Sequence, residues 1–163
     1  MLALRYVYVL ALALWLGGMV VLGAVVAPTT FQVLQASVPA SGRLLGGAVF
    51  GAILSRFHYV AYGAGAVALV SLAAMALLGP RPRGFAVRSA IVGVMLLISL
   101  YSGLVVLGEV DAIQQEIGAL PSSLPASDTR RARFDELHRL STQLMMANII
   151  GALVLLYWEA RET

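Results

Sequence analysis

The segment 6–27, YVYVLALALWLGGMVVLGAVVA, contains 22 successive residues without a charged side chain. About 20 apolar residues are enough for one α-helix to cross the hydrocarbon core of a bilayer. Three more largely apolar runs follow, over residues 58–78, 87–107 and 138–158. The sequence therefore predicts an all-α polytopic membrane protein, a bundle of four transmembrane helices in a single domain over residues 1–163.

The composition supports this class and excludes others. Apolar residues make up 60% of the chain and charged residues 12%, with a mean hydropathy of +0.89, values that a soluble domain does not tolerate. All eleven basic residues are arginines near the ends of apolar runs, which indicates anchoring at lipid headgroups rather than nucleic-acid binding. The chain has no cysteine, so disulfides, thiolate metal sites and sulfur nucleophiles are excluded.

The first apolar run follows Arg5 and in that respect resembles a signal peptide. It is longer than a typical signal-peptide core, and it lacks a convincing A-x-A cleavage site before Pro28. We therefore expect a retained first span.

Three of the predicted helices are longer than the membrane, because helical pattern continues over 41–79, 86–118 and 128–161. At 1.5 Å per residue these lengths are roughly 58, 49 and 51 Å, against roughly 30 Å of hydrocarbon. We expect the excess to project on the side of the connections 28–57 and 109–137. Ser127 is the predicted N-cap of the last helix, with Asp128 favourable at its positive end.

The segment 41–57 has two interpretations. Its apolar residues form a stripe that would suit a helix lying on the membrane surface. Continuation of the second transmembrane helix is the interpretation that we favour. The prolines at 80 and 82 end that helix on the opposite side.

The arginines suggest an orientation in the membrane. The terminal side of the bundle has five and the other side six, but three of the five lie in or beside the short connection 79–88. Basic residues in short loops favour the cytoplasmic side. We expect cytoplasmic N- and C-termini in a bacterial inner membrane. The terminal-side arginines are Arg5, Arg81, Arg83, Arg88 and Arg161.

Polar residues at membrane depth are the usual signs of function, because lipid burial is unfavourable for them. On the fourth helix His138, Ser141, Thr142, Met145 and Asn148 fall on one face, which we expect to point inward. The third helix has a matching face with Met95, Ser99, Ser102, Gly103 and Glu109. This track would suit an ion, a haem, a quinone headgroup or a translocated proton. Alternatively, its polar groups join the helices by hydrogen bonds, which is the interpretation that we favour.

His58 and His138 both begin a span on the same side of the membrane, near Tyr59, Glu109, Asp111 and Asp135. Two imidazoles from facing helices can ligate haem iron or, with a carboxylate, a divalent metal. The alternative is that each histidine is a hydrogen-bond partner at a helix end. No cofactor is favoured by the sequence, and haem or metal is the less favoured interpretation.

The glycines of the predicted spans and the lack of catalytic motifs argue against an enzyme. Gly17, Gly18, Gly47 and Gly51 fit close helix packing. The sequence contains no G-x-S-x-G motif and no phosphate-binding loop, and its serines have no evident base. We therefore predict that the protein is not an enzyme.

Three segments carry a resemblance to a known family. They are Trp15-Leu16-Gly17-Gly18, Ala27-Pro28-Thr29-Thr30-Phe31, and the stretch from Phe134 to Asn148. Together they resemble the bacterial relatives of the transmembrane protein 205 family, small four-helix membrane proteins of unknown function. The likeness extends over nearly the whole chain and implies the fold.

A more distant resemblance connects the first span to copper-resistance membrane proteins of the CopD type and haem-binding oxidases of the HemJ type. In such proteins a histidine commonly lies two helical turns before the tryptophan. Tyr8 occupies that position here, so this resemblance implies no haem or copper site on the first helix.

Three functions follow from these observations. The leading prediction is a non-enzymatic structural or accessory subunit of a larger membrane complex, with other membrane subunits or a second copy as partners. The second is transport of an ion or small solute along the polar track. The third is binding of haem, metal or quinone at His58 and His138.

Overall fold

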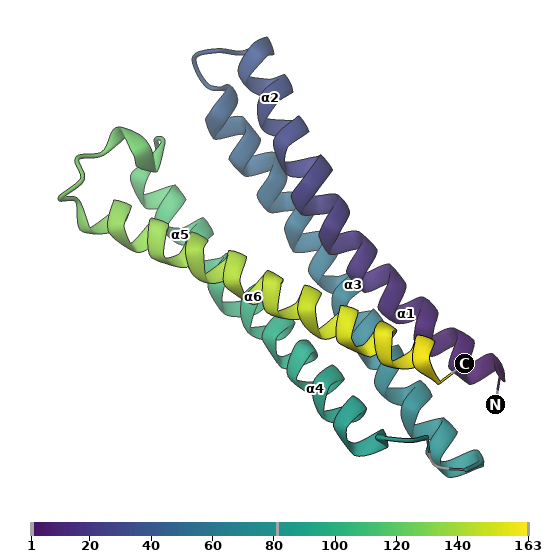
Figure 1. Ribbon diagram of the computed structural model, residues 1–163. Coiled ribbons are helices and arrows are strands. Elements are labelled where there is room, and N and C mark those ends of the chain that lie inside the picture. Colours follow the sequence, from purple (N-terminus) through teal and green to yellow (C-terminus); the bar gives the residue numbers. More distant parts are fainter. Residues whose placement is uncertain (1, 81, 163) are drawn as a thin grey trace.

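The computed structural model describes residues 2–80 and 82–162, which form four long helical rods (Figure 1). Arg81, one of the terminal-side arginines, lies outside these ranges. All four rods are long and apolar enough to span a membrane, so the prediction of an all-α four-helix membrane bundle is confirmed. The elements are α1 (Leu2–Val21), η1 (Leu22–Val26), α2 (Ala27–Ser37), α3 (Gly42–Leu78), α4 (Phe85–Tyr101), η2 (Ser102–Val106), α5 (Leu107–Ile117), η3 (Pro121–Ser123) and α6 (Thr129–Arg161).

The first rod differs from the sequence prediction, which ended its span at Ala27. The helix continues to Ser37 and contains 36 residues, so all four rods, not three, exceed the membrane thickness. A proline inside a helix normally kinks or ends it, because it lacks a backbone N–H and its ring clashes with the preceding turn. Here the π-helical η1 immediately precedes Pro28 and changes that turn.

The segment 41–57 belongs to the continuous helix α3, so the preferred interpretation is confirmed and the surface helix is wrong. It packs along α2 at very short range. A Cβ added to Gly42 would lie 2.1 Å from the backbone oxygen of Leu34, and one added to Gly46 would lie 2.7 Å from the ring of Phe31. Only glycine permits this approach, which pairs α2 with the projecting part of α3.

The N-cap of α6 is Asp128, and the prediction of Ser127 is wrong. The Asp128 carboxylate accepts a hydrogen bond from the backbone N–H of Arg130 at 2.9 Å and is paired with the guanidinium of the same residue at 2.8 Å. These contacts hold the pKa of Asp128 at about 2, below its ordinary value, chiefly through the side-chain hydrogen bond with Arg130. An ionised carboxylate suits the positive end of the helix dipole better than a hydroxyl.

The rods form two hairpin-like pairs that are close together near the chain termini and separate toward the loops (Figure 1). One pair joins α1 and α2 to α3, and the other joins α4 and α5 to α6. Near the termini an apolar layer fills the space between the pairs. Its fully buried members include Tyr8, Leu12, Ala68, Leu72, Val92, Ala152 and Leu155.

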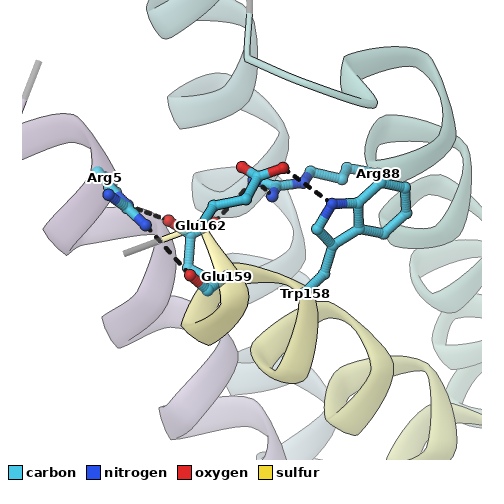
Figure 2. Close-up of polar contacts among 5 residues, drawn as sticks. All are labelled: Arg5, Arg88, Trp158, Glu159 and Glu162. Carbon is cyan, nitrogen blue, oxygen red and sulfur yellow. Dashed lines mark hydrogen bonds and ion pairs between the residues drawn. The ribbon is translucent and has the colours of Figure 1, made fainter.

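A cluster of charges closes the terminal end of the bundle. Figure 2 shows side chains from α1, α4 and the end of α6 gathered around Glu159. Arg88 is only 2% exposed and pairs with Glu159 at 2.7 Å and with Glu162 at 2.6 Å. Arg5 also pairs with Glu159, and the Arg88 guanidinium lies 5.2 Å from the centre of the Trp158 ring. Three helices are therefore joined by ion pairs at this end.

Candidate functional site

A cavity of about 400 Å³ lies where the two helical pairs separate. Every rod contributes to its wall, and most of the lining is apolar. The deepest lining residues are Trp15 on α1, Ser99 on α4 and Asn148 on α6, while Phe31, Gln114 and Phe134 lie toward the loops. We call these two ends the floor and the mouth of the cavity.

The floor contains buried polar groups. The amide nitrogen of Asn148 donates a hydrogen bond to the Ser99 hydroxyl oxygen at 2.9 Å and joins α6 to α4. The side-chain oxygen of Asn148 and the indole nitrogen of Trp15 have no hydrogen-bond partner among the described residues. Native proteins rarely leave such buried atoms unsatisfied without a bound water, ion or ligand. Both atoms are enclosed by the surrounding side chains, with less than 1 Å² of accessible surface each.

His58 lies in the cavity wall and is held in place by its own helix. Its Nδ1 is 2.9 Å from the backbone oxygen of Leu54, so Nδ1 carries the proton and Nε2 is left as the acceptor. The ring packs against Gly103, where an added Cβ would be 2.6 Å from His58 and 2.1 Å from the Tyr62 hydroxyl. The absence of a side chain at Gly103 therefore allows α3 to approach η2.

His138 occupies a different position, at the mouth. It is exposed, and its ring stacks on Phe134 with 6.2 Å between the ring centres and 7° between the planes. Both histidines line the cavity, but they belong to different layers of it. Among residues 2–80 and 82–162 no three histidine, cysteine or acidic side chains gather as a metal-binding group.

The remaining residues predicted from the sequence divide into two groups. Ser141 and Met145 line the cavity together with Asn148, as expected for one face of α6. Glu109 instead pairs with Arg133 at 2.6 Å on an exposed surface, and Asp135 is exposed. Neither carboxylate contributes to the cavity wall.

Two further residues line the cavity near its mouth: Asp111, which was expected only as a neighbour of the two histidines, and Gln114, which was not predicted from the sequence. Both residues lie on α5 and face α3. A Cβ added to Gly51 would be 3.9 Å from the Asp111 carboxylate, and one added to Gly47 would be 3.7 Å from the Gln114 amide. Asp111 and Gln114 are three residues apart, and this spacing alone would have predicted that both side chains lie on the same face of a helix. Gly47 and Gly51 therefore shape the cavity wall as well as the space between helices.

The other two packing glycines differ. Gly18 lies against Phe57, where an added Cβ would be 2.2 Å from the ring, so its lack of a side chain brings α1 and α3 together. At Gly17 an added Cβ would meet no described atom within 4 Å. The space beside Gly17 is open to the outside of the bundle.

Both π-helical segments border the cavity. Leu22 and Gly23 of η1, and Ser102 and Val106 of η2, are among its lining residues. Single π-helical turns within α-helices occur frequently at functional sites. Periodicity did not predict them, because a one-turn change in hydrogen bonding leaves the apolar pattern nearly intact.

Comparisons with known proteins give one match. The profile of a family described as "Domain of unknown function (DUF4149)" matches residues 10–118, which include α1 from Leu10 onward and every element from η1 to α5. No curated protein and no solved structure matches the chain.

Proposed function

The chain belongs to the DUF4149 family, and we propose that it is a non-enzymatic, multi-pass membrane protein that binds a small amphipathic molecule in its cavity. The cavity carries this proposal. Ligand pockets typically enclose about 300–1,000 Å³, with mostly apolar walls and a few polar groups that fix orientation. This cavity has about 400 Å³ and mostly apolar walls, with the polar side chains of His58, Ser102 and Ser141 among its lining residues.

The size of the cavity favours a molecule over an ion. One water molecule takes up roughly 30 Å³ in the liquid, so the space corresponds to several waters rather than to one coordinated ion. The absence of an acidic cluster among the described lining residues agrees with this choice, since Asp111 is the one carboxylate in the wall.

The apolar layer favours binding over transport. The transport hypothesis requires a polar track that continues toward the terminal side. Below Trp15 and Asn148, however, the buried side chains are mostly apolar, with Leu12, Val92 and Leu155 each 0% exposed; the polar ones among them are Tyr8 and Ser71. These side chains separate the floor of the cavity from the charges around Glu159, so the cavity is closed at its deep end.

The proposal is tested by filling the cavity. Gly51→Leu places a side chain where the nearest neighbour of the added Cβ is 3.9 Å away, so the bulk goes into the cavity. Gly17→Leu is the matched control, because it adds the same side chain outside the bundle. Native mass spectrometry of gently solubilised protein should find a bound small molecule on the unaltered chain and on Gly17→Leu, and not on Gly51→Leu. Equal occupancy of both variants, or an unaltered chain without any bound molecule, would overturn the proposal.

The prediction of an accessory subunit concerns the outer surface and is compatible with a ligand in the cavity. The exposed apolar side chains of the spans, such as Leu97 and Ile150, suit either lipid or another membrane subunit. Identification of stoichiometric co-purifying membrane proteins in the same sample would support the subunit prediction. A chain that purifies alone from its native membrane would contradict it.

The finer statements about family and location also remain proposals. The segments that resemble the transmembrane protein 205 family support a relation within the DUF4149 family. Arginines 83 and 88 beside the short connection support cytoplasmic termini in a bacterial inner membrane. A reporter protein fused after Thr163 that is active only outside the cytoplasm should be inactive, and activity would reverse the orientation.

A further inference from the structure

We infer that the cavity holds one acyl chain of a phospholipid from the leaflet at the loop end of the bundle, with the lipid head at the mouth and the chain directed toward the floor. The chain enters sideways, between the first rod and α6. This inference rests on the proposed function and adds the class, the orientation and the route of the ligand.

The depth of the floor corresponds to the middle of a bilayer. The charges around Glu159, with Trp158 beside them, mark the membrane boundary at the terminal end, where charged and aromatic side chains are favourable. Trp15 lies ten residues after Arg5 on α1. Asn148 lies eleven residues before Glu159 on α6. At 1.5 Å per residue these separations are roughly 15–17 Å, and half of the hydrocarbon core is roughly 15 Å.

The polar residues of the mouth lie at the level of the lipid heads. His138 is 21 residues before Glu159 on α6. This separation is roughly 32 Å, just beyond the roughly 30 Å of hydrocarbon. Asp111 and Gln114 line the same end of the cavity. The cavity therefore extends through one leaflet, from its polar boundary toward the middle of the bilayer.

The wall between mouth and floor suits an apolar chain. Methionine side chains in this wall adapt to irregular apolar ligands because they are unbranched and flexible. A volume of about 400 Å³ is near the lower end of the range for ligand pockets, which favours one chain over two. The apolar residues of this part of the wall include Met19, Leu22, Phe57, Val106 and Met145.

The packing of the rods leaves one seam as the route of entry. Both α1 and α4 pack against α3 and α6, so the two helical pairs meet along two opposite seams. In the seam between α3 and η2, the side chains of His58 and Tyr62 fill the space beside Gly103. In the other seam the first rod and α6 diverge toward the loops (Figure 1). There the methyl carbon of Met145 would be 3.5 Å from a Cβ added to Gly23, and a flexible side chain opposite a glycine can move aside.

Photolabelling of the unaltered chain tests the occupant and its orientation. The probes are phosphatidylcholines with a diazirine near the methyl end or near the head of one chain, added in nanodiscs. Met146 is the matched control for Met145, because it is the next residue on α6, is 52% exposed and is not among the lining residues. We expect the methyl-end probe to label Met145 and the head-end probe to label Phe134. Labelling of Met145 should saturate with probe, whereas labelling of Met146 should rise in proportion to it.

The route is tested by closing the seam. The chain has no cysteine, so Gly23→Cys with Met145→Cys provides a unique pair for a short bifunctional thiol reagent. Cross-linking before phospholipid is added should abolish the lipid adduct in native mass spectrometry, and cross-linking after equilibration should retain it. The order of the two steps is the control, and equal adducts in both orders would reject the lateral route.

The outcomes separate this inference from the proposed function. Head-end labelling of Met145 with methyl-end labelling of Phe134 would reject the orientation. Proportional labelling of Met145 and Met146, together with a bound molecule of another class, would reject the phospholipid and leave a ligand-binding cavity. A chain without any bound molecule would reject both proposals. Photolabelling uses the unaltered chain, so it decides the matter even if the cysteine variant does not fold.

Discussion

Glu159→Gln is the most informative change at the terminal end, because one buried carboxylate joins three helices. It removes the charge that pairs with Arg88 at 2.7 Å and with Arg5, and leaves a guanidinium that is 2% exposed with Glu162 as its remaining acidic partner (Figure 2). Breaking a buried pair from one side typically costs about 3–5 kcal/mol. Because Glu162 remains, we expect the low end, about 3 kcal/mol, which lowers the unfolding temperature by about 6–12 °C in a chain of this size.

The assay is thermal unfolding in a mild detergent, followed by intrinsic fluorescence or loss of the monodisperse peak. Glu136→Gln is the matched control, since Glu136 pairs with Arg133 at 2.9 Å on an exposed surface and should change stability by less than about 1 kcal/mol. The double change Arg88→Met with Glu159→Leu should recover most of the loss, because an apolar replacement removes both buried charges. An unfolding temperature of Glu159→Gln equal to that of Glu136→Gln would refute the assignment of a buried structural ion pair.

Three further predictions address other parts of the bundle. Gly103→Ala places a Cβ 2.1 Å from the Tyr62 hydroxyl and should destabilise the chain by about 1–3 kcal/mol in thermal unfolding. Gly93→Ala is the control, because its Cβ meets no described atom within 4 Å and should not destabilise the chain. Equal effects of the two changes would contradict the close approach of α3 to η2. Because the folded-state pKa of Asp128 is about 2, below its ordinary value of 3.8, its stabilisation of α6 is complete above that ordinary value and disappears as pH falls through about 2. Protection of the backbone amides at the start of α6 from hydrogen exchange should show this pH dependence, and Asp128→Ala should abolish it. The same pH dependence in the variant would mean that a group other than Asp128 titrates. Optical spectra of the oxidised and reduced native protein should show no haem band, and a band abolished by His58→Ala or His138→Ala would establish the cofactor hypothesis instead.

Much of the fold follows from apolar run length, because the membrane imposes a nearly fixed span. The end of α3 at Leu78 and the continuation of 42–57 as helix were predictable from prolines and from uninterrupted pattern. The continuation of α1 beyond Pro28 was not, since a proline usually ends a helix and only the π-helical turn before it changes that outcome. The cap at Asp128 was missed because serine and aspartate are nearly equivalent N-caps in isolation, and the choice depends on Arg130.

The site was predictable to a similar degree. Helical spacing placed Ser141, Met145 and Asn148 on one face, and they do line one cavity. Spacing could not show that Trp15 lines the same cavity as Asn148, because that depends on how helices from opposite ends of the chain pack. Glu109 shares the face of Ser99 by periodicity, but η2 lies between them and an exposed arginine is nearby, so Glu109 pairs at the surface.

Each π-helical turn gives the chain a place where one residue could be lost without reorienting the helix that follows. A π turn accommodates about one residue more than an α turn, and one residue corresponds to about 100° of rotation about the axis of a regular α-helix. Deleting a single residue between Ser102 and Val106 would let the rod continue as regular α-helix, and α5 would keep its rotation because the π turn already takes up the extra residue. Asp111 and Gln114 would then still face α3, and the bond between Ser99 and Asn148 would stay in place. The same deletion in the regular helix just before Asp111 would instead turn both side chains away from α3.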